Sequence, residues 1–561
     1  MTPGLARASA VIAAAALALV CAGASSARQP PQDVARFTLA NGARVLVRPE
    51  PASGLVAACV FVRAPNVSEE GQAATGQVLA RSLFGANDNL TREAVSRSIL
   101  ALGGGIEVTW QPDYVLVSCV TTPDAFPDAF WLLAQAIKHP VFDEVTVDAA
   151  RAGASAAARA GETDRLERAL AAARRALYAG GPYAQRYDGS DATLRRVTRD
   201  AVARHYLQRF APANTVVSIA GAIDAASARR IVDDQLIDFE TPRSRRRRHT
   251  PPPPRYAAPS RVAERAPGAT VLVLAAYPAP AAGEADYPAA MVLTALLGQG
   301  KSSRLFRALR GDSGVGYMVG AEMPALAGPG HLAAFVEYGA ERNGGTGADP
   351  EATLLQTVRS VLERPPTDAE LARARRYAAG AYVLAHQRVR DRAWFAGLFE
   401  TIAGGWETDR DMASRLGAVT AADVARVATR CLREPVVVVL GPHRGIPLTV
   451  TRVDLPGGEI ARPRTVDGVR AGVPRVAVAG RPSEQPHPPG VAPVWHAHYA
   501  RVVEIAVAPQ QRESGRLPPT GPRSSRGPPC HGALRAAAGP LSLRNDIERH
   551  EELASRRDAV L

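Results

Sequence analysis

The chain has few cysteines for its length. It contains five among 561 residues, and the four that follow the first 30 residues are far apart: Cys59, Cys119, Cys431 and Cys530. There is no CxxC pair or other close spacing, so the sequence suggests neither a zinc ribbon nor a disulfide framework. Cys59 and Cys119 lie in apolar, strand-like runs, and we expect them to be ordinary core residues.

Long hydrophobic runs are also scarce. The apolar stretch ASAVIAAAALALVCAGA follows Arg7 and leads to small residues before Ala27. It is shorter than the about 20 residues that a membrane span needs, and its basic start and small-residue end fit a secretory signal peptide. We therefore predict a signal peptide at residues 1–27, no stable membrane span, and export across the inner membrane to the periplasm. A lipoprotein anchor at Cys21 is disfavoured because bulky residues precede it.

Basic residues exceed acidic ones, and the formal net charge is +13. Such an excess can indicate a nucleic-acid partner. Here a dense block, RSRRRRH at 243–249, stands beside four consecutive prolines, and much of the remaining excess lies near the C-terminus. This distribution is typical of a solvated linker and tail, so we expect no nucleic-acid partner.

Two segments about 220 residues apart resemble each other. VTRDAVARHYLQRFAPANTVVSIAGAID and VTAADVARVATRCLREPVVVVLGPHR each begin with a threonine suited to a helix N-cap, Thr198 or Thr420. Each continues through an amphipathic helix containing VAR into a β-branched strand, which ends at Gly221 or Gly441. These segments indicate an internal repeat.

The beginnings of the two copies also correspond. Strand-like runs at 54–65 and 269–280 each lead into an apolar helix, at 75–85 and 289–300 respectively. The offset between the copies is nearly constant. We therefore predict a duplicated domain, with copies at residues 33–240 and 256–448.

Strands followed by long alanine-rich helices favour an α+β fold. The longest helical pattern runs through residues 143–178. We expect each copy to form a mainly antiparallel sheet with helices packed on one face. The Arg/Pro-rich residues 241–255 predict a semi-rigid linker, and the low-complexity residues 455–561 predict a disordered tail.

Two further motifs are LLGQGKSSRLFRALRGDSGVGYMV at 296–319 and GSDATLRRVTRDAVARHYLQRFAPANTVVSIAGAID at 189–224. They resemble motifs of the insulinase/pitrilysin (inverzincin) peptidases, which include the mitochondrial processing peptidases and bacterial relatives. The resemblance implies two duplicated domains that face each other as a clamshell. It also implies a zinc ion held by His-x-x-Glu-His and a distant glutamate in active members.

This sequence lacks that zinc motif. Neither His-x-x-Glu-His nor His-Glu-x-x-His occurs in the chain. The motif positions are predicted to be Leu79, Ser82 and Leu83, and the distant glutamate falls in AARAGASAAARAG (149–161), which has no carboxylate. Leucine has no lone pair to offer zinc, and serine is a poor ligand. We therefore predict no metal and no catalytic residue in this chain, with zinc expected only on a partner subunit.

The histidines offer no replacement ligand set. Only His139 and His205 lie between the predicted signal and linker. His139 stands in a loop-like KHP sequence, and we expect His205 on a surface helix. We interpret both as ordinary, non-ligand histidines.

Arg310 and Tyr317 keep the seven-residue spacing of a pair found in the resembled family. The resemblance implies that the tyrosine hydroxyl donates to the substrate carbonyl while the arginine holds the substrate backbone. The spacing alone is also compatible with a surface arginine and a half-buried aromatic residue. Gly311 stands where the family has a glutamate, so a local orienting carboxylate is missing unless Asp312 substitutes for it.

Two functional hypotheses follow. The first is a zinc-free subunit, inactive alone, of a metallopeptidase heterodimer, in which Arg310 and Tyr317 bind a peptide substrate in trans. The alternative is a non-catalytic pseudopeptidase that acts as a scaffold or binds peptides. A peptidase with an unrelated site is disfavoured because the chain has no Gly-x-Ser-x-Gly elbow, reactive-cysteine setting or phosphate loop.

Overall fold

A computed structural model describes residues 34–64, 72–103, 105–179, 181–240, 256–312, 314–340, 349–433, 435–442, 451–452 and 503–504. The predicted signal peptide and linker lie outside these residues. So does the predicted tail, except Val503–Glu504, which form a strand rather than the expected disordered chain. We refer to residues 34–240 as the N-terminal half, 256–442 as the C-terminal half and 455–561 as the C-terminal stretch.

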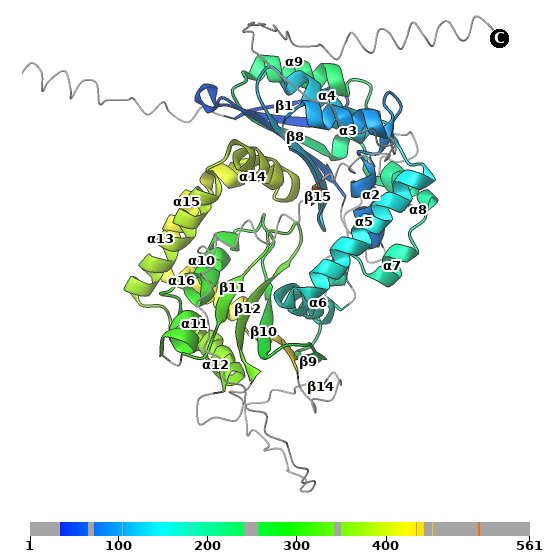
Figure 1. Cartoon of the computed structure of the whole chain (residues 1–561). Coiled ribbons are helices and arrows are strands. Elements are labelled where there is room, and N and C mark those ends of the chain that lie inside the picture. Colours follow the sequence, from blue (N-terminus) through cyan, green and yellow to red (C-terminus); the bar gives the residue numbers. More distant parts are fainter. Residues whose placement is uncertain are drawn as a thin grey trace, which may run out of the picture. The chain divides into compact units, whose positions relative to one another are not determined.

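The protein is a mixed α+β structure (Figure 1). The N-terminal half contains β1 (Ala35–Thr38), β2 (Arg44–Pro49), β3 (Val56–Arg63), α2 (Gln72–Ser82), β4 (Ala86–Asn87), α3 (Arg92–Ala101), β5 (Ile106–Trp110), β6 (Tyr114–Thr121), α4 (Phe126–Lys138), β7 (Pro140–Val141), α5 (Glu144–Thr163), α6 (Arg165–Leu177), α7 (Asp191–Arg195), α8 (Arg199–Arg209), β8 (Thr215–Gly221) and α9 (Ala225–Leu236).

The C-terminal half contains a second set of strands and helices. They are β9 (Ser260–Arg265), β10 (Thr270–Ala279), α10 (Tyr287–Gly298), α11 (Arg304–Phe306), the π-helical turn η4 (Arg307–Asp312), β11 (Met318–Glu322), β12 (Gly330–Gly339), α12 (Pro350–Glu363), α13 (Asp368–Ala385), α14 (Val389–Ile402), α15 (Glu407–Ala418), α16 (Ala421–Cys431) and β13 (Val436–Gly441). Two short strands follow it, β14 (Thr451–Arg452) and β15 (Val503–Glu504).

The two large sheets have corresponding strand orders. The N-terminal sheet runs β1-β2-β8-β3-β6-β5-β15, and the C-terminal sheet runs β14-β9-β13-β10-β12-β11. In each sheet one parallel pair, β2 with β8 or β9 with β13, lies beside antiparallel strands. The order β2-β8-β3-β6 thus matches β9-β13-β10-β12, as the sequence similarity of the two segments would require.

The two similar sequence segments begin and end in similar local structure. The side chain of Thr198 accepts from the N–H of Ala201 at the start of α8, and Thr420 forms a capping box at the start of α16. The following strands, β8 and β13, end at Gly221 and Gly441 as expected. Gly221 has φ +131°, and a Cβ there would lie 2.1 Å from the carbonyl oxygen of Leu55, so only glycine fits.

The single long helix predicted for residues 143–178 is wrong, because the chain breaks at Asp164. This residue is extended, with ψ 109°, and its carboxylate accepts from the N–H of Glu167. Asp164 therefore ends α5 and caps α6. The change of direction allows α6 to leave its own half and pack against β10 and β13.

Both faces of each large sheet are covered, which corrects the prediction of helices on one face. In β10, alternate residues belong to two different cores: Val271 and Val273 pack with α10 and α16, whereas Leu272 and Leu274 pack with α6. Correspondingly, α14 of the C-terminal half packs against β3 and β8. The helix on the second face of each sheet thus comes from the other half of the chain. Local sequence patterns do not predict this exchange of helices between the halves.

Ion pairs fix the exchanged helices in place. Arg165 at the start of α6 pairs with Glu337 of β12 at 3.0 Å. Arg392 of α14 binds both carboxylate oxygens of Glu50, the shortest distance being 2.6 Å. Each pair is mostly buried, so it orients its helix in an environment with weak solvent screening.

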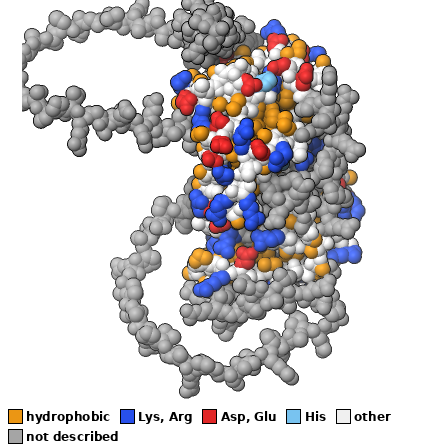
Figure 2. Space-filling view, turned by 90° about the vertical axis from the view of Figure 1, so that its right-hand side faces the viewer, with side chains coloured by type: hydrophobic (Ala, Val, Ile, Leu, Met, Phe, Trp, Pro, Cys, Tyr) orange, Lys and Arg blue, Asp and Glu red, His pale blue; other side chains and the backbone are white. Residues whose placement is uncertain are grey.

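Basic and acidic side chains are interspersed on the face that carries α5, α7 and α8 (Figure 2). Several form ion pairs along this face, such as Arg159 with Asp191 at 3.2 Å. In the described residues, no helix combines the length and the apolar character needed to cross a membrane.

Candidate functional site

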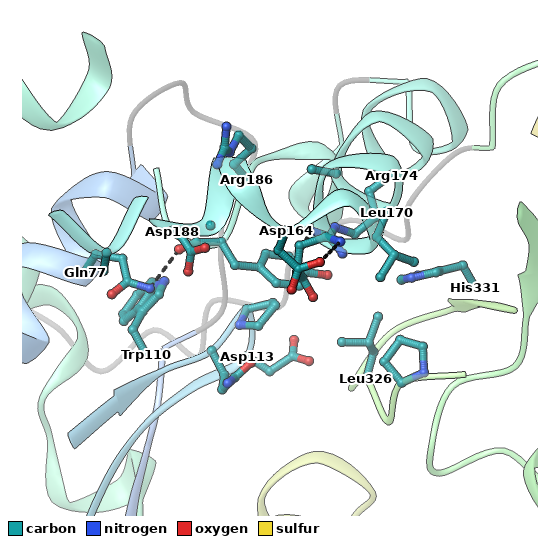
Figure 3. A pocket seen from close by; sticks show the side chains of 18 of the residues that line it. Gln77, Trp110, Asp113, Asp164, Leu170, Arg174, Arg186, Asp188, Leu326 and His331 are labelled. Atoms are coloured by element: carbon teal, nitrogen blue, oxygen red, sulfur yellow. Dashed lines mark hydrogen bonds and ion pairs between the residues drawn. The ribbon is translucent and has the colours of Figure 1, made fainter. Parts of the chain in front are cut away.

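A cavity of about 210 Å³ lies beside the helix that was expected to carry the zinc motif (Figure 3). Its wall comes from α2, the β5–β6 turn, α5, α6 and residues 186–188 of the N-terminal half, and from residues 322–331 of the C-terminal half. Figure 3 shows Gln77 and Trp110 on one side of this space and Leu326 and His331 on the other. We call it the α2 cavity.

Only Gln77 and Arg81 of α2 line the α2 cavity. These residues are four apart and therefore share one face of the helix. The predicted motif positions lie elsewhere: Leu79, Ser82 and Leu83 are at most 1% exposed and belong to the packed interior. The Ser82 hydroxyl donates to the carbonyl oxygen of Val78 at 2.8 Å. Two positions along an α-helix correspond to a rotation of about 200° around its axis. Leu79 and Leu83 therefore point away from the side of α2 on which Gln77 and Arg81 line the cavity.

The residues opposite α2 are small. Ala157 and Gly161 of α5 line the cavity, and both belong to the segment predicted to lack the distant glutamate. A Cβ at Gly153 of α5 would lie 3.5 Å from Nη1 of Arg81, so the guanidinium of Arg81 extends along this helix. Burial lowers the pKa of Arg81, and the nearby Asp188 opposes this shift. A positively charged side chain thus stands between α2 and α5.

No group of three or more His, Cys, Asp or Glu side chains is placed to hold a metal ion in the described part of the chain. At the α2 cavity, the side chains of Gln77 and Arg81 are poor candidates for zinc binding. Arginine presents only donors, and Gln77 already donates its amide to the carbonyl oxygen of Tyr187 at 3.0 Å. The side chains of Gln77 and Arg81 are therefore compatible with the absence of zinc, which stays a prediction.

A buried aspartate joins the two halves at the cavity. Asp113 accepts from the hydroxyl of Tyr183 and from the N–H of Ala327, both at 2.9 Å. The Tyr183 oxygen in turn accepts from the N–H of Gly328 at 2.9 Å. Burial raises the pKa of Asp113 despite these donors. This network holds the turn before β12 against the β5–β6 turn.

The structure brings Arg310 and Tyr317 together on the surface. Nη1 of Arg310, in η4, donates to the backbone carbonyl oxygen of Tyr317. The guanidinium carbon also lies 5.8 Å from the centre of the Phe306 ring. The N–H of Tyr317 donates to the carbonyl oxygen of Glu337 at 2.7 Å, while its side chain is 59% exposed. The backbone of Tyr317 is therefore fixed and its phenol faces solvent.

The pair does not line the α2 cavity of its own chain. Tyr317 directly precedes β11, whose last residue, Glu322, does line the cavity. At about 3.3 Å per residue, Tyr317 and Glu322 are about 16 Å apart along the strand. The structure thus separates the predicted substrate-binding pair from the region of the predicted zinc motif.

The expectation for His205 is wrong in one respect. It is 5% exposed rather than on the surface, because α8 packs against α2. Its ring lies 5.5 Å from that of Trp110, and burial, aided by Arg209, lowers its pKa to about 3. His139 ends α4 as expected for a loop-proximal residue, with Nε2 3.3 Å from Asp238.

The sequence interpretation missed Gln77, Arg81 and Asp113. A signal for the first two was present, since they are polar residues four positions apart in QVLARSLFG, where Ser82 is the other polar residue. For Asp113 there was no signal, because both of its partners are remote in sequence.

Comparisons with known proteins find similarity to peptidases and to a peptidase-related domain. Residues 196–377 match a family described as the peptidase M16 inactive domain. Zinc proteases from Mycobacterium bovis and Mycobacterium tuberculosis are 26% identical to the chain over 420 residues, which cover 73% of this chain and 93% of theirs.

Solved structures show the same fold. A peptidase M16 inactive domain from Pseudomonas fluorescens aligns with a TM-score of 0.66 at 18% identity, and a protease from Helicobacter pylori aligns with 0.66 at 16%. Each alignment covers 73% of this chain and at least 98% of the other. The chain is thus similar to peptidase M16 proteins in part of its sequence and in its fold, and its sequence has no His-x-x-Glu-His motif.

Proposed function

We propose that the protein is the zinc-free subunit of an M16 metallopeptidase heterodimer and supplies Arg310 and Tyr317 in trans to a zinc-bearing partner. One observation carries this proposal: the phenol of Tyr317 is exposed on a fixed backbone, about 16 Å along β11 from its own α2 cavity. An exposed phenol can donate to a developing oxyanion on a substrate held by another chain.

In this proposal the two halves are duplicated domains that face each other, as in the clamshell implied by the family resemblance. We further propose that the degenerate zinc motif lies at Gln77, Ala80 and Arg81 rather than at Leu79, Ser82 and Leu83. The cavity-facing positions of Gln77 and Arg81 support this register, because a metal that acts on substrate needs access to open space. Arg81 would then provide positive charge in a place where active relatives bind zinc.

The experiment pairs this chain with a zinc-motif M16 relative and measures peptide cleavage. With Tyr317→Phe we expect kcat to fall about 100-fold, since losing one oxyanion donor costs about 3 kcal/mol of barrier. Tyr377→Phe is the matched control, because Tyr377 is also partly exposed but lies on α13. An unchanged turnover number in Tyr317→Phe removes the proposal of catalysis in trans.

The second candidate is a non-catalytic scaffold or peptide-binding pseudopeptidase. Arg310 is already engaged by the carbonyl oxygen of Tyr317, which favours this alternative. It predicts that Arg310 and Tyr317 are neutral to mutation in any complex. In both readings we propose a periplasmic protein that binds peptide or protein partners and no nucleic acid.

A further inference from the structure

The outer edge of β5 is occupied by the chain's own C-terminal stretch. On its inner side β5 pairs along its whole length with β6, from Ile106 opposite Cys119 to Trp110 opposite Val115. On its outer side it pairs with β15, with Val503 opposite Val108 and Glu504 opposite Glu107, antiparallel. The outer edge of a strand presents N–H and C=O groups to which another extended segment can pair.

The sequence around β15 suits this role. Residues 502–507 read VVEIAV, with four β-branched residues in six positions, within a stretch otherwise rich in Pro, Gly and Arg. Such residues favour strands. The pairing of Val503–Glu504 with β5 therefore has a local cause in the sequence as well as a partner in the fold.

The occupied edge leads to the α2 cavity. Trp110, the last residue of β5, and Gln111, which follows it, line that cavity. At the other end, Glu107 forms an ion pair with Arg390 at the start of α14. The two residues of β15 pair with Glu107 and Val108, so they occupy this part of the β5 edge and block it for any other chain.

We propose that the segment containing Val503–Glu504 is an intramolecular occupant of the β5 edge, and that another extended peptide pairs with β5 only after this segment leaves. Because the segment is tethered, its effective concentration at the edge is of millimolar order. A free peptide at micromolar concentration competes poorly against it. The proposal concerns one chain and depends on neither zinc nor a partner subunit.

The test uses the full-length protein and a double variant, Val503→Pro with Glu504→Pro. Proline removes a ladder donor and disfavours strand pairing. The matched control, Val476→Pro with Ala477→Pro, places the same change elsewhere in the C-terminal stretch. The probes are hydrogen exchange of the amides of residues 106–110 and binding of a labelled peptide with the sequence of residues 500–508, ARVVEIAVA. A scrambled peptide reports nonspecific binding.

We expect exchange in β5 to accelerate, and the peptide to bind the double variant at least about tenfold more tightly than the unmodified chain. The control variant should match the unmodified chain in both measurements. Circular dichroism and Tm check that the double variant stays folded. Unchanged exchange in β5, or equal peptide binding to the double variant and the unmodified chain, overturns the proposal.

Discussion

The guanidinium of Arg310 donates from Nη1 to the backbone carbonyl oxygen of Tyr317, so the two members of the predicted pair are in direct contact. Arginine has five N–H donors in a fixed fork, and one bond to a carbonyl leaves others for a substrate. The contact also braces the turn that precedes β11. Arg310 is exposed, so neither residue depends on core packing for its position.

Replacement of Arg310 should impair substrate binding more than folding. With Arg310→Ala in the proposed heterodimer, we expect KM for a peptide to rise about tenfold, because a charge-assisted hydrogen bond contributes about 1.5 kcal/mol or more. Peptidase kinetics check this, with Arg307→Ala as control, since Arg307 pairs with Glu370 instead. A normal KM in Arg310→Ala contradicts a substrate-binding role.

The register of the degenerate motif can be tested by restoring zinc ligands. We expect Gln77→His, Ala80→Glu, Arg81→His and Ala157→Glu together to bind about one zinc ion per chain, because Gln77, Arg81 and Ala157 line one cavity. Elemental analysis after dialysis measures the metal. A folded quadruple variant without zinc rejects this register.

The alternative register serves as the matched control. Leu79→His, Ser82→Glu and Leu83→His place polar groups in a packed interior, where each unpaired group costs about 1–3 kcal/mol. We expect this variant to lose most of its stability in urea unfolding and to bind no zinc. Zinc binding by the triple variant would restore the register predicted from the sequence.

The exchanged helix α14 depends on a buried carboxylate. Glu400 accepts from Arg36 at 2.8 Å and Arg44 at 2.7 Å, and its side chain is fully buried. Glu400→Ala should lower the free energy of unfolding by about 3 kcal/mol, since it removes the buried carboxylate that both arginines share. Glu407→Ala is the control: Glu407 lies 3.7 Å from Arg36 but is 44% exposed, so we expect less than about 1 kcal/mol. Equal losses would contradict the assigned role of Glu400.

The Asp113 network should make stability depend on pH. Because burial raises the pKa of Asp113 above its ordinary 3.8, the folded state holds this proton more tightly than the unfolded state. The stabilisation is complete below the unfolded pKa and is lost as pH rises through the folded pKa. We therefore expect this residue to contribute a fall in the free energy of unfolding as the pH rises above about 4.

Asp113→Asn should remove that contribution. It should also lower stability by about 1–3 kcal/mol at the acidic end, because one acceptor of the Tyr183 and Ala327 donors is replaced by a donor. Urea unfolding at several pH values provides the measurement, with Asp124→Asn, an exposed acid, as control. If the pH slope persists in Asp113→Asn, a different group is responsible.

Local structure followed closely from local pattern. The caps at Thr198 and Thr420, the strands ending at Gly221 and Gly441 and the buried Cys59 all agree with expectation, because each depends on interactions within a few residues or on simple alternation. The break at Asp164 was missed, since alanine-rich sequence has high helix propensity on both sides of it.

The sequence by itself determined the α+β class, the similarity of the two strand sets and the absence of a His-x-x-Glu-His motif, because composition, periodicity and residue identity are local properties. Only the tertiary structure decided which face of α2 meets a cavity, that α6 and α14 exchange between halves, and that Val503–Glu504 lie beside β5. These features arise from contacts between residues that are far apart in the sequence. The free energies of such contacts cannot be predicted from any short stretch of the chain.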